Sequence, residues 1–303
     1  MEIINYFPTK IKIVLEEFSK YYTNLNEIRI RIGCPIILKI GQDEKILNYK
    51  VSSEEISEIM QNICENSIYS YQLQMCEGYI TVNGGHRVGI SGNVVIKDEK
   101  IININYIYSL NFRIAKQIKG CSNLIFKQIV HRDKIGNTLI VSPPGLGKTT
   151  ILRDLARNIS DGMQEINFNG VDVSIIDERS EIAAMHKGVP QNDVGIRTDV
   201  INNVKKSIGI KMAVRSLAPK VIIADEIGNK NDADAINYAI CSGVTGIFSA
   251  HGKNIEDLKK NLEINELLSK EIFNNIVFLD EHTKGRIREI WTREPTPCST
   301  TKE

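Results

Sequence analysis

The residues best suited to chemistry in this 303-residue chain lie between an apolar run and a helical pattern. The segment consists of Ser142, Pro143, Pro144, Gly145, Leu146, Gly147, Lys148, Thr149 and Thr150. Backbone N–H groups of such a glycine-containing loop, together with the positive end of the following helix, surround phosphate groups. We expect Lys148 to reach the β- and γ-phosphates, Thr149 to place its hydroxyl on Mg²⁺, and Thr150 to lie near the α-phosphate. The segment therefore predicts a site for ATP and Mg²⁺.

The segment departs from the P-loop pattern G-x-x-x-x-G-K-[ST] at its first position, where Ser142 replaces glycine. Serine is small, and Gly145 and Gly147 are retained, so we expect the loop geometry to survive. The alternative is an ordinary glycine-rich turn before a helix. The apolar run before the loop and the intact Gly-Lys-Thr favour the nucleotide interpretation.

Two apolar runs end in Asp-Glu, at Asp177-Glu178 and at Asp225-Glu226. Ligands of open parallel sheets bind at the carboxyl ends of the strands, so both pairs are placed for chemistry. The second pair fits a Walker B element better: Asp225 would hold Mg²⁺ and Glu226 would polarise the attacking water. Asp177, Glu178 and Glu181 would then be acids at the edge of the site. The alternative is that acids simply end strands because loops are solvated, and Glu181 fits it well.

His251 follows the apolar run 245–249 and is a candidate sensor of the γ-phosphate, although a single histidine is often structural. Arginines can stabilise the charge on a transferred phosphoryl group, often from a neighbouring subunit. Arg215 and Arg197 are the preferred candidates. For most arginines of the chain, an ordinary ion pair is the simpler explanation.

The second part of the chain alternates short apolar runs with helical patterns, which is typical of βαβ units and a parallel sheet. The expected strands are 137–141, 171–176, 221–224 and 245–249, and the expected helices 149–159, 202–217, 231–241 and 254–269. A final antiparallel hairpin is expected at 276–279 and 285–291. This order predicts an α/β, three-layer P-loop NTPase core of the RecA/AAA+ kind.

The first part mixes patterns typical of an α+β domain. A helical pattern covers 9–22, alternating strands cover 27–32 and 35–40, and one or two helices are expected within 52–73. Ser52 and Glu55 form a capping-box pattern, and Asn83-Gly84 predicts a hairpin. We therefore divide the chain into an N-terminal domain (1–118), an ATPase domain (119–292) and a disordered tail (293–303).

Composition excludes several classes of protein. The formal net charge is +1, and residues 1–120 contain 14 basic and 13 acidic side chains, so neither half is a basic domain that binds nucleic acid by bulk charge. No window approaches the apolar length of a membrane helix, and the first residues do not read as a signal peptide. The six cysteines show neither C-x-x-C spacing nor metal-type clusters, which fits a reducing compartment. We expect a cytoplasmic protein.

Up to about residue 292, the order of motifs resembles the family of stage III sporulation protein AA, the ATPase of endospore-forming bacteria. The motifs are the P-loop, 177–182, 188–199, 225–228 and 249–252, with 78–81, 84–92 and 109–114 upstream. That family is similar to the ATPases of type II and type IV secretion and pilus systems. In those relatives an acidic box follows the P-loop and a histidine box comes later. Asp177, Glu178 and Glu181 match the first box, and His251 matches the second.

The resemblance implies a homo-hexameric ring in the mother-cell cytoplasm, docked on membrane proteins of the sporulation channel and energising that channel. Many secretion ATPases have lost the Walker B aspartate and use a glutamate of the acidic box, whereas this chain keeps Asp225. Glu226 and Glu178 are thus both candidates for activating water, and we favour Glu226. Two other functions stay open: a RecA-like nucleic-acid-binding ATPase, and an ATP-gated scaffold with little turnover.

Overall fold

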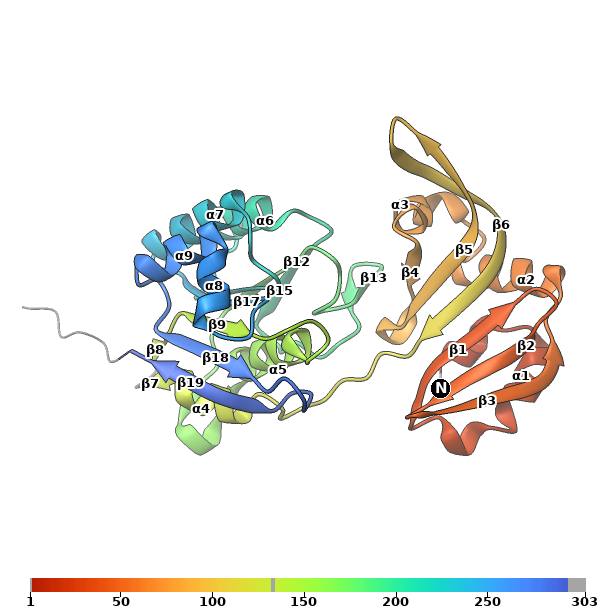
Figure 1. Ribbon diagram of the computed structural model, residues 1–303, viewed down its shortest axis with the longest axis horizontal. Helices are drawn as coiled ribbons and strands as arrows, with labels where there is room; N and C mark the ends of the chain where they lie inside the picture. The colour runs from red at the N-terminus through yellow and green to blue at the C-terminus, as the bar shows by residue number, and fades with distance from the viewer. Residues whose placement is uncertain (1, 132–133, 294–303) are drawn as a thin grey trace, which may run out of the picture. The chain divides into compact units, whose positions relative to one another are not determined.

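We describe a computed structural model of the chain, which covers residues 2–131 and 134–293 (Figure 1). Its contacts form two compact units. The first contains Met1–Lys116 and Ala184–Gln191, and the second contains Gln117–Ala183 and Asn192–Glu303. The division expected from the sequence is contiguous, so it placed residues 184–191 in the ATPase domain. Their contacts instead place them in the first unit. Residues 294–303 of the expected tail lie outside the described residues.

The first unit is built on a six-stranded antiparallel sheet in the order β3-β2-β1-β6-β5-β4. Its strands are β1 (Leu25–Arg31), β2 (Pro35–Ile40), β3 (Asp43–Lys50), β4 (Tyr79–Thr81), β5 (Arg87–Lys97) and β6 (Lys100–Arg113). Its helices are α1 (Thr9–Glu16), α2 (Ser53–Ile63) and α3 (Gln72–Cys76), with 3₁₀ turns η1 (Glu2–Tyr6), η2 (Ser19–Tyr21), η3 (Ile68–Tyr71) and η4 (Asn83–Gly85). Apolar side chains from the helices and the sheet form one buried core, in which Phe7 and Phe112 stack at 4.6 Å between ring centroids.

Local sequence signals explain several of these elements. The capping box at α2 is confirmed: Glu55 N–H donates to Ser52 Oγ at 3.2 Å, and Ser52 N–H donates to Glu55 Oε2 at 2.9 Å. The hairpin expected at Asn83-Gly84 joins β4 to β5, with Gly84 at φ +80°. The helix expected over 9–22 is shorter, since α1 ends at Glu16 and only a 3₁₀ turn follows.

A short hairpin of the first unit comes from far along the sequence. Its strands are β13 (Met185–His186) and β14 (Val189–Pro190). Lys187 pairs with Glu65, and Gln191 Oε1 accepts from Gly84 N–H at 2.8 Å. Nδ1 of His186 lies 3.2 Å from the carbonyl oxygen of Thr81, and burial lowers the pKa of this histidine. These partners explain why the segment belongs to the first unit.

The second unit contains a seven-stranded sheet in the order β15-β12-β16-β17-β9-β18-β19. Its strands are β9 (Thr138–Val141), β12 (Val173–Asp177), β15 (Thr198–Asn202), β16 (Val221–Ala224), β17 (Thr245–Ala250), β18 (Asn275–Leu279) and β19 (Ile287–Thr292). All neighbouring pairs are parallel except β18 and β19, which form the expected final hairpin. The helices are α4 (Asn123–Ile129), α5 (Lys148–Asp161), α6 (Lys206–Ser216), α7 (Lys230–Cys241), α8 (Ile255–Lys260) and α9 (Leu262–Ser269). Smaller elements are β7 (Val130–His131), β8 (Lys134–Ile135), β10 (Gly162–Met163), η5 (Gln164–Ile166) and β11 (Phe168–Asn169).

This unit has the predicted three layers. In Figure 1, α4 and α5 lie on one side of the sheet, and α6, α7, α8 and α9 lie on the other. Strands β9, β12 and β16 are almost wholly buried because helices cover both faces.

Strand β15 is missing from the sequence prediction, which instead started a helix at residue 202. The segment Thr198–Asn202 is polar and only half-buried at the edge of the sheet, so it lacks the apolar run that marks the central strands. Helix α6 begins at Lys206.

No helix among residues 2–131 and 134–293 has the length and apolar character needed to cross a membrane. The five cysteines in that part of the chain are unpaired. Burial raises the pKa of Cys64 and of Cys121 to about 11.

Candidate nucleotide-binding site

The P-loop joins β9 to α5 at the carboxyl edge of the parallel strands. Within 142–150, positive φ occurs only at Gly145 (+80°) and Gly147 (+98°), which are the positions where glycine costs least strain. Ser142 needs no such freedom, so its side chain is accommodated, and its Oγ donates to the carbonyl of Pro143 at 2.8 Å. The first amides of α5 have no intrahelical acceptor and are available to an anion.

Lys148 is buried at the start of α5, and its ammonium group lies inside the loop. It donates to the carbonyl oxygens of Ser142 (2.8 Å) and Pro143 (3.1 Å). Burial lowers the pKa of Lys148, and the nearby carboxylates of Asp225 and Glu226 oppose that shift. A buried cation surrounded by neutral carbonyl groups is well placed to exchange those partners for phosphate oxygens.

The two expected metal-binding residues are in contact. Thr149 Oγ1 donates to Asp225 Oδ2 at 2.5 Å, which joins the start of α5 to the end of β16. Ser249, at 0 % exposure on β17, donates its hydroxyl proton to Asp225 Oδ1 and accepts from Glu226 N–H at 2.9 Å. Mg²⁺ is usually bound through one or two protein oxygens together with phosphates and water, and this hydroxyl–carboxylate pair fits that donor set. No separate cluster of three or more histidine, cysteine or acidic side chains suited to a metal occurs in the described part of the chain.

Glu226 is held at both carboxylate oxygens. His251 Nε2 lies 3.0 Å from its Oε1, and Arg179 Nη1 lies 3.0 Å from its Oε2. His251 Nδ1 is also 3.1 Å from Lys148 Nζ, so the ammonium group donates to Nδ1 and the neutral ring carries its proton on Nε2. Glu226 itself has φ +51°, an uncommon value for a residue with a side chain and one that clusters at functional sites.

Asp177 stabilises the loop that follows β12. It is 3 % exposed, and its carboxylate accepts from the backbone N–H groups of Glu181, Ile182 and Ala183 at 2.7–3.2 Å. Arg153 of α5 donates to the carbonyl oxygens of Glu181 and Ile182. The expected acid at the edge of the site therefore fixes the loop 178–183, and Glu181 contributes main-chain atoms to that loop.

Glu178 forms an ion pair with Lys206, the first residue of α6. The ammonium-bearing side chain is 12 % exposed, so the pair is partly shielded from water. Glu178 and Glu226 line the same small pocket, but Glu226 is the one linked to His251 and through it to Lys148.

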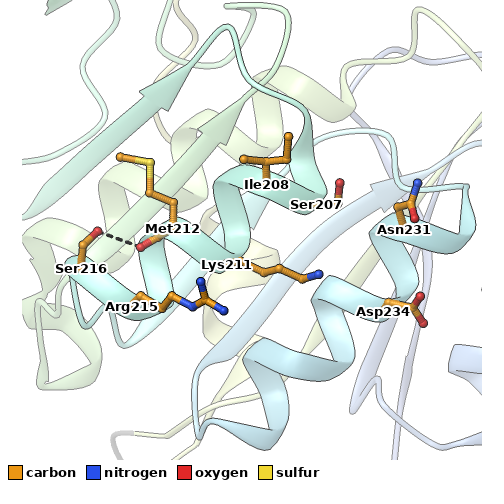
Figure 2. Close-up of a pocket in the computed structure, with 8 residues that line it drawn as sticks. All are labelled: Ser207, Ile208, Lys211, Met212, Arg215, Ser216, Asn231 and Asp234. Carbon is orange, nitrogen blue, oxygen red and sulfur yellow. Dashed lines mark hydrogen bonds between the residues drawn. The ribbon is translucent and has the colours of Figure 1, made fainter.

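Arg215 does not reach the P-loop within one chain. Figure 2 shows it in the last turn of α6, lining a pocket of about 530 Å³ between α6 and α7. The pocket residues are Ser207, Ile208, Lys211, Met212, Arg215, Ser216, Asn231 and Asp234. Ile208 and Met212 are more than half exposed there.

Arg197 directly precedes β15, which is the strand at one edge of the sheet. Its guanidinium donates to the carbonyl of Ser160 at 2.8 Å, and its N–H donates to Ser160 Oγ at 2.6 Å. Ser160 is in the last turn of α5, where a cation satisfies helix carbonyls and complements the helix dipole. The P-loop is at the other end of this 14-residue helix, so Arg197 has a stabilising position within the chain.

Three residues that contact the candidate site were not assigned a role from the sequence. Ser249 lay within a quoted motif without a role, Arg179 was one of several arginines, and Gly285 had no signal at all. Gly285 N–H donates to the carbonyl of Leu146 at 2.9 Å, so the turn between β18 and β19 rests on the P-loop. Only Ser249 offered a clue, as a polar residue near the end of β17, because strand ends of a parallel sheet meet at one edge.

Taken together, the sheet order and the P-loop define an α/β protein with the fold of the secretion and pilus-retraction ATPases. The ATPase DotB of Legionella pneumophila superimposes with a TM-score of 0.59 and 16 % identity, covering 90 % of this chain and 76 % of that chain. DotB of Yersinia pseudotuberculosis gives a TM-score of 0.61 and 15 % identity over 94 % and 80 % of the two chains. The pilus retraction motor PilT with bound ADP gives 0.54 and 16 % identity over 88 % and 78 %. At such identities the likeness shows a common fold.

The chain belongs to the family described as "Sporulation stage III, protein AA", whose sequence profile matches residues 1–296. It is 35 % identical to stage III sporulation protein AA of Bacillus subtilis (strain 168), over 99 % of this chain and 97 % of that protein. It is also 30 % identical to the protein SEEDLING PLASTID DEVELOPMENT 1 of Arabidopsis thaliana, over 59 % of this chain and 25 % of that longer protein.

Proposed function

We propose that the chain is a Mg²⁺-dependent ATPase that hydrolyses ATP to ADP and phosphate. The observation that carries this proposal is the convergence of Lys148, the Thr149–Asp225 pair and the Glu226–His251 pair at one edge of the sheet. Phosphate binding, metal binding and water activation each have residues of suitable chemistry there.

Each group has a defined task in the proposed reaction. The amides of 145–150 and Lys148 bind the β- and γ-phosphates, and Thr149 and Asp225 hold Mg²⁺. Bound Mg²⁺ supplies positive charge against the developing negative charge of the phosphoryl oxygens. Glu226 accepts a hydrogen bond from the attacking water while the new P–O bond forms and the bond from γ-phosphorus to the bridging oxygen breaks. His251 orients Glu226 and, beside Lys148, lies where it responds to the γ-phosphate.

Glu226 is a better candidate than Glu178 for activating water. Glu226 directly follows the metal-binding Asp225 and is connected to Lys148 through His251. The carboxylate of Glu178 instead forms an ion pair with Lys206 of α6. We therefore place Glu178 in a supporting position beside the site.

Family membership and the secretion-ATPase fold also support a proposal about the assembly and cellular role of this ATPase. We propose a homo-hexamer in the mother-cell cytoplasm that docks on membrane proteins of the sporulation channel and energises its assembly or operation. In such a ring Arg215 of α6, in its open pocket, is our candidate for an arginine that contacts a neighbouring copy.

The test is Mg²⁺-dependent phosphate release by the purified chain, compared with Lys148→Ala. We expect Lys148→Ala to abolish turnover and to weaken nucleotide binding, because the P-loop cation is lost. Lys127→Ala is the matched control, since Lys127 is an exposed lysine of α4 paired with Glu165. Turnover at the parental rate in Lys148→Ala would refute the site, and tight ATP binding without turnover in the parent would favour the scaffold alternative. ATPase stimulated several-fold by DNA or RNA, in a salt-dependent way, would favour the nucleic-acid alternative.

A further inference from the structure

We propose that Arg179 is a positioning residue of this site, which orients the carboxylate of Glu226 toward the attacking water. This inference rests on the proposed ATPase function. Arg179 donates to Oε2 of Glu226 at 3.0 Å, while His251 lies 3.0 Å from Oε1. The carboxylate is therefore held from both sides, once by the strand end after β12 and once by the strand end after β17.

The two contacts leave the carboxylate free to act. A carboxylate offers about four lone-pair positions, two on each oxygen. The guanidinium and the imidazole use one position on each oxygen, so one position on each remains for a water molecule. With only one donor in place, the carboxylate would rotate about its terminal bond and the remaining acceptor would lose its direction.

The backbone that carries Arg179 is fixed by interactions independent of Glu226. Asp177, two residues earlier, is buried and accepts three backbone N–H groups of the following loop. Arg153 holds the carbonyl oxygens of Glu181 and Ile182 on the other side. Such a supported loop presents a side chain in a defined place, which catalytic geometry requires.

The Arg179–Glu226 pair contributes little to holding the fold together. The side chain of Arg179 is 69 % exposed and that of Glu226 is 34 % exposed. Ion pairs in such positions are weak because water and salt screen them. Removing the guanidinium should thus change the chemistry of the site without unfolding the chain.

The experiment compares Arg179→Ala and Arg179→Lys with the parent protein. We expect Arg179→Ala to lower kcat about 10-fold, with KM for ATP and the affinity for ADP unchanged within about 2-fold, because orientation of the reacting groups is lost while phosphate binding is kept. Arg179→Lys should recover part of kcat, since lysine still donates to Oε2. Arg293→Ala is the matched control, because Arg293 forms an exposed pair with Glu271 outside the site.

A double-mutant cycle shows whether Arg179 acts through Glu226. Glu226→Asp keeps a carboxylate but shortens the side chain, so adding Arg179→Ala should cost little further activity. A second readout is binding of ADP with aluminium fluoride, which mimics the transferred phosphoryl group. Arg179→Ala should weaken this complex and leave ADP binding intact.

Three results would overturn the role of Arg179: an unchanged or increased kcat in Arg179→Ala, a raised KM for ATP, or a full additional loss on top of Glu226→Asp. A raised KM would indicate direct contact with the phosphates, and a full additional loss would mean that Arg179 acts independently of Glu226. If the parent protein itself neither binds nor hydrolyses ATP, the proposed function fails as well. If the parent is active and Lys148→Ala inactive, only the Arg179 inference is at stake.

Discussion

Nε2 of His251 lies 3.0 Å from Oε1 of Glu226, and the same imidazole reaches Lys148 through Nδ1 at 3.1 Å. One ring therefore joins the residue proposed to bind phosphate to the residue proposed to activate water. In the proposed ATPase, bound phosphates would draw Lys148 away, so His251 would lose one partner and keep the other. A histidine in this place can relate occupancy of the P-loop to the orientation of Glu226.

Replacing His251 should separate binding from catalysis. We expect His251→Ala to reduce kcat about 10- to 100-fold, with nucleotide affinity nearly unchanged, because the P-loop stays intact. His251→Gln should retain more activity, since its amide N–H₂ can still donate to Glu226. Steady-state kinetics and equilibrium binding of ADP provide the measurements. A loss of ADP affinity as large as the loss in kcat would place His251 in binding instead.

Replacing Glu226 should lower kcat far more than replacing Glu178. We expect Glu226→Gln to reduce kcat about 100-fold or more, while it still binds ATP, because the amide keeps the shape but not the charge. Glu178→Gln should reduce kcat by less than about 5-fold, since Glu178 pairs with Lys206. Single-turnover phosphate release and nucleotide binding measure both variants. The reverse ranking would assign water activation to Glu178.

Arg197 and Arg215 should have different phenotypes. Arg197→Ala should lower the free energy of unfolding by about 1–2 kcal/mol, because the carbonyl of Ser160 loses a charged donor at the end of α5. Arg215→Ala should leave stability unchanged and should lower turnover only at concentrations where copies associate. Denaturant unfolding, and ATPase rate as a function of protein concentration, test the pair. An equal loss of dilute, unassociated activity in both variants would contradict this placement.

Asp154 of α5 should contribute to the acid sensitivity of the second unit. It is 1 % exposed and accepts from the backbone of Gly120 and Ser122, the Ser122 hydroxyl and Arg157. Burial alone would raise its pKa, but hydrogen bonds from Ser122 and Arg157 outweigh burial and hold the pKa below the usual value. Asp154→Asn should cost about 1–3 kcal/mol of unfolding free energy at neutral pH.

The sign of the pH effect follows from that lowered pKa. The ionised carboxylate contributes stability above the unfolded pKa of about 3.9 and loses that contribution as pH falls through the lower folded value. The difference in unfolding free energy between parent and Asp154→Asn should therefore be constant from about pH 5 to 8 and should shrink below about pH 4. Urea unfolding across this range measures it, and a difference that grows on acidification would disprove the assignment.

The amino-acid sequence by itself determined the local features of this protein. The P-loop from Ser142 to Thr150, the capping box at Ser52, and the buried strands before Asp177 and Asp225 all depend on neighbours within a few residues. Apolar runs alternating with helical patterns also predicted the three-layer core, since a parallel sheet must be covered on both faces.

Only the tertiary structure decided how distant residues combine. The sequence placed Asp177 and Glu226 alike at strand ends, yet one is sealed in a loop and the other is held between His251 and Arg179. The same holds for Arg197, which caps α5 instead of reaching the site. Strand order in the sheet sets these distances, and strand order arises from contacts between segments that are far apart in the chain, which no local pattern records.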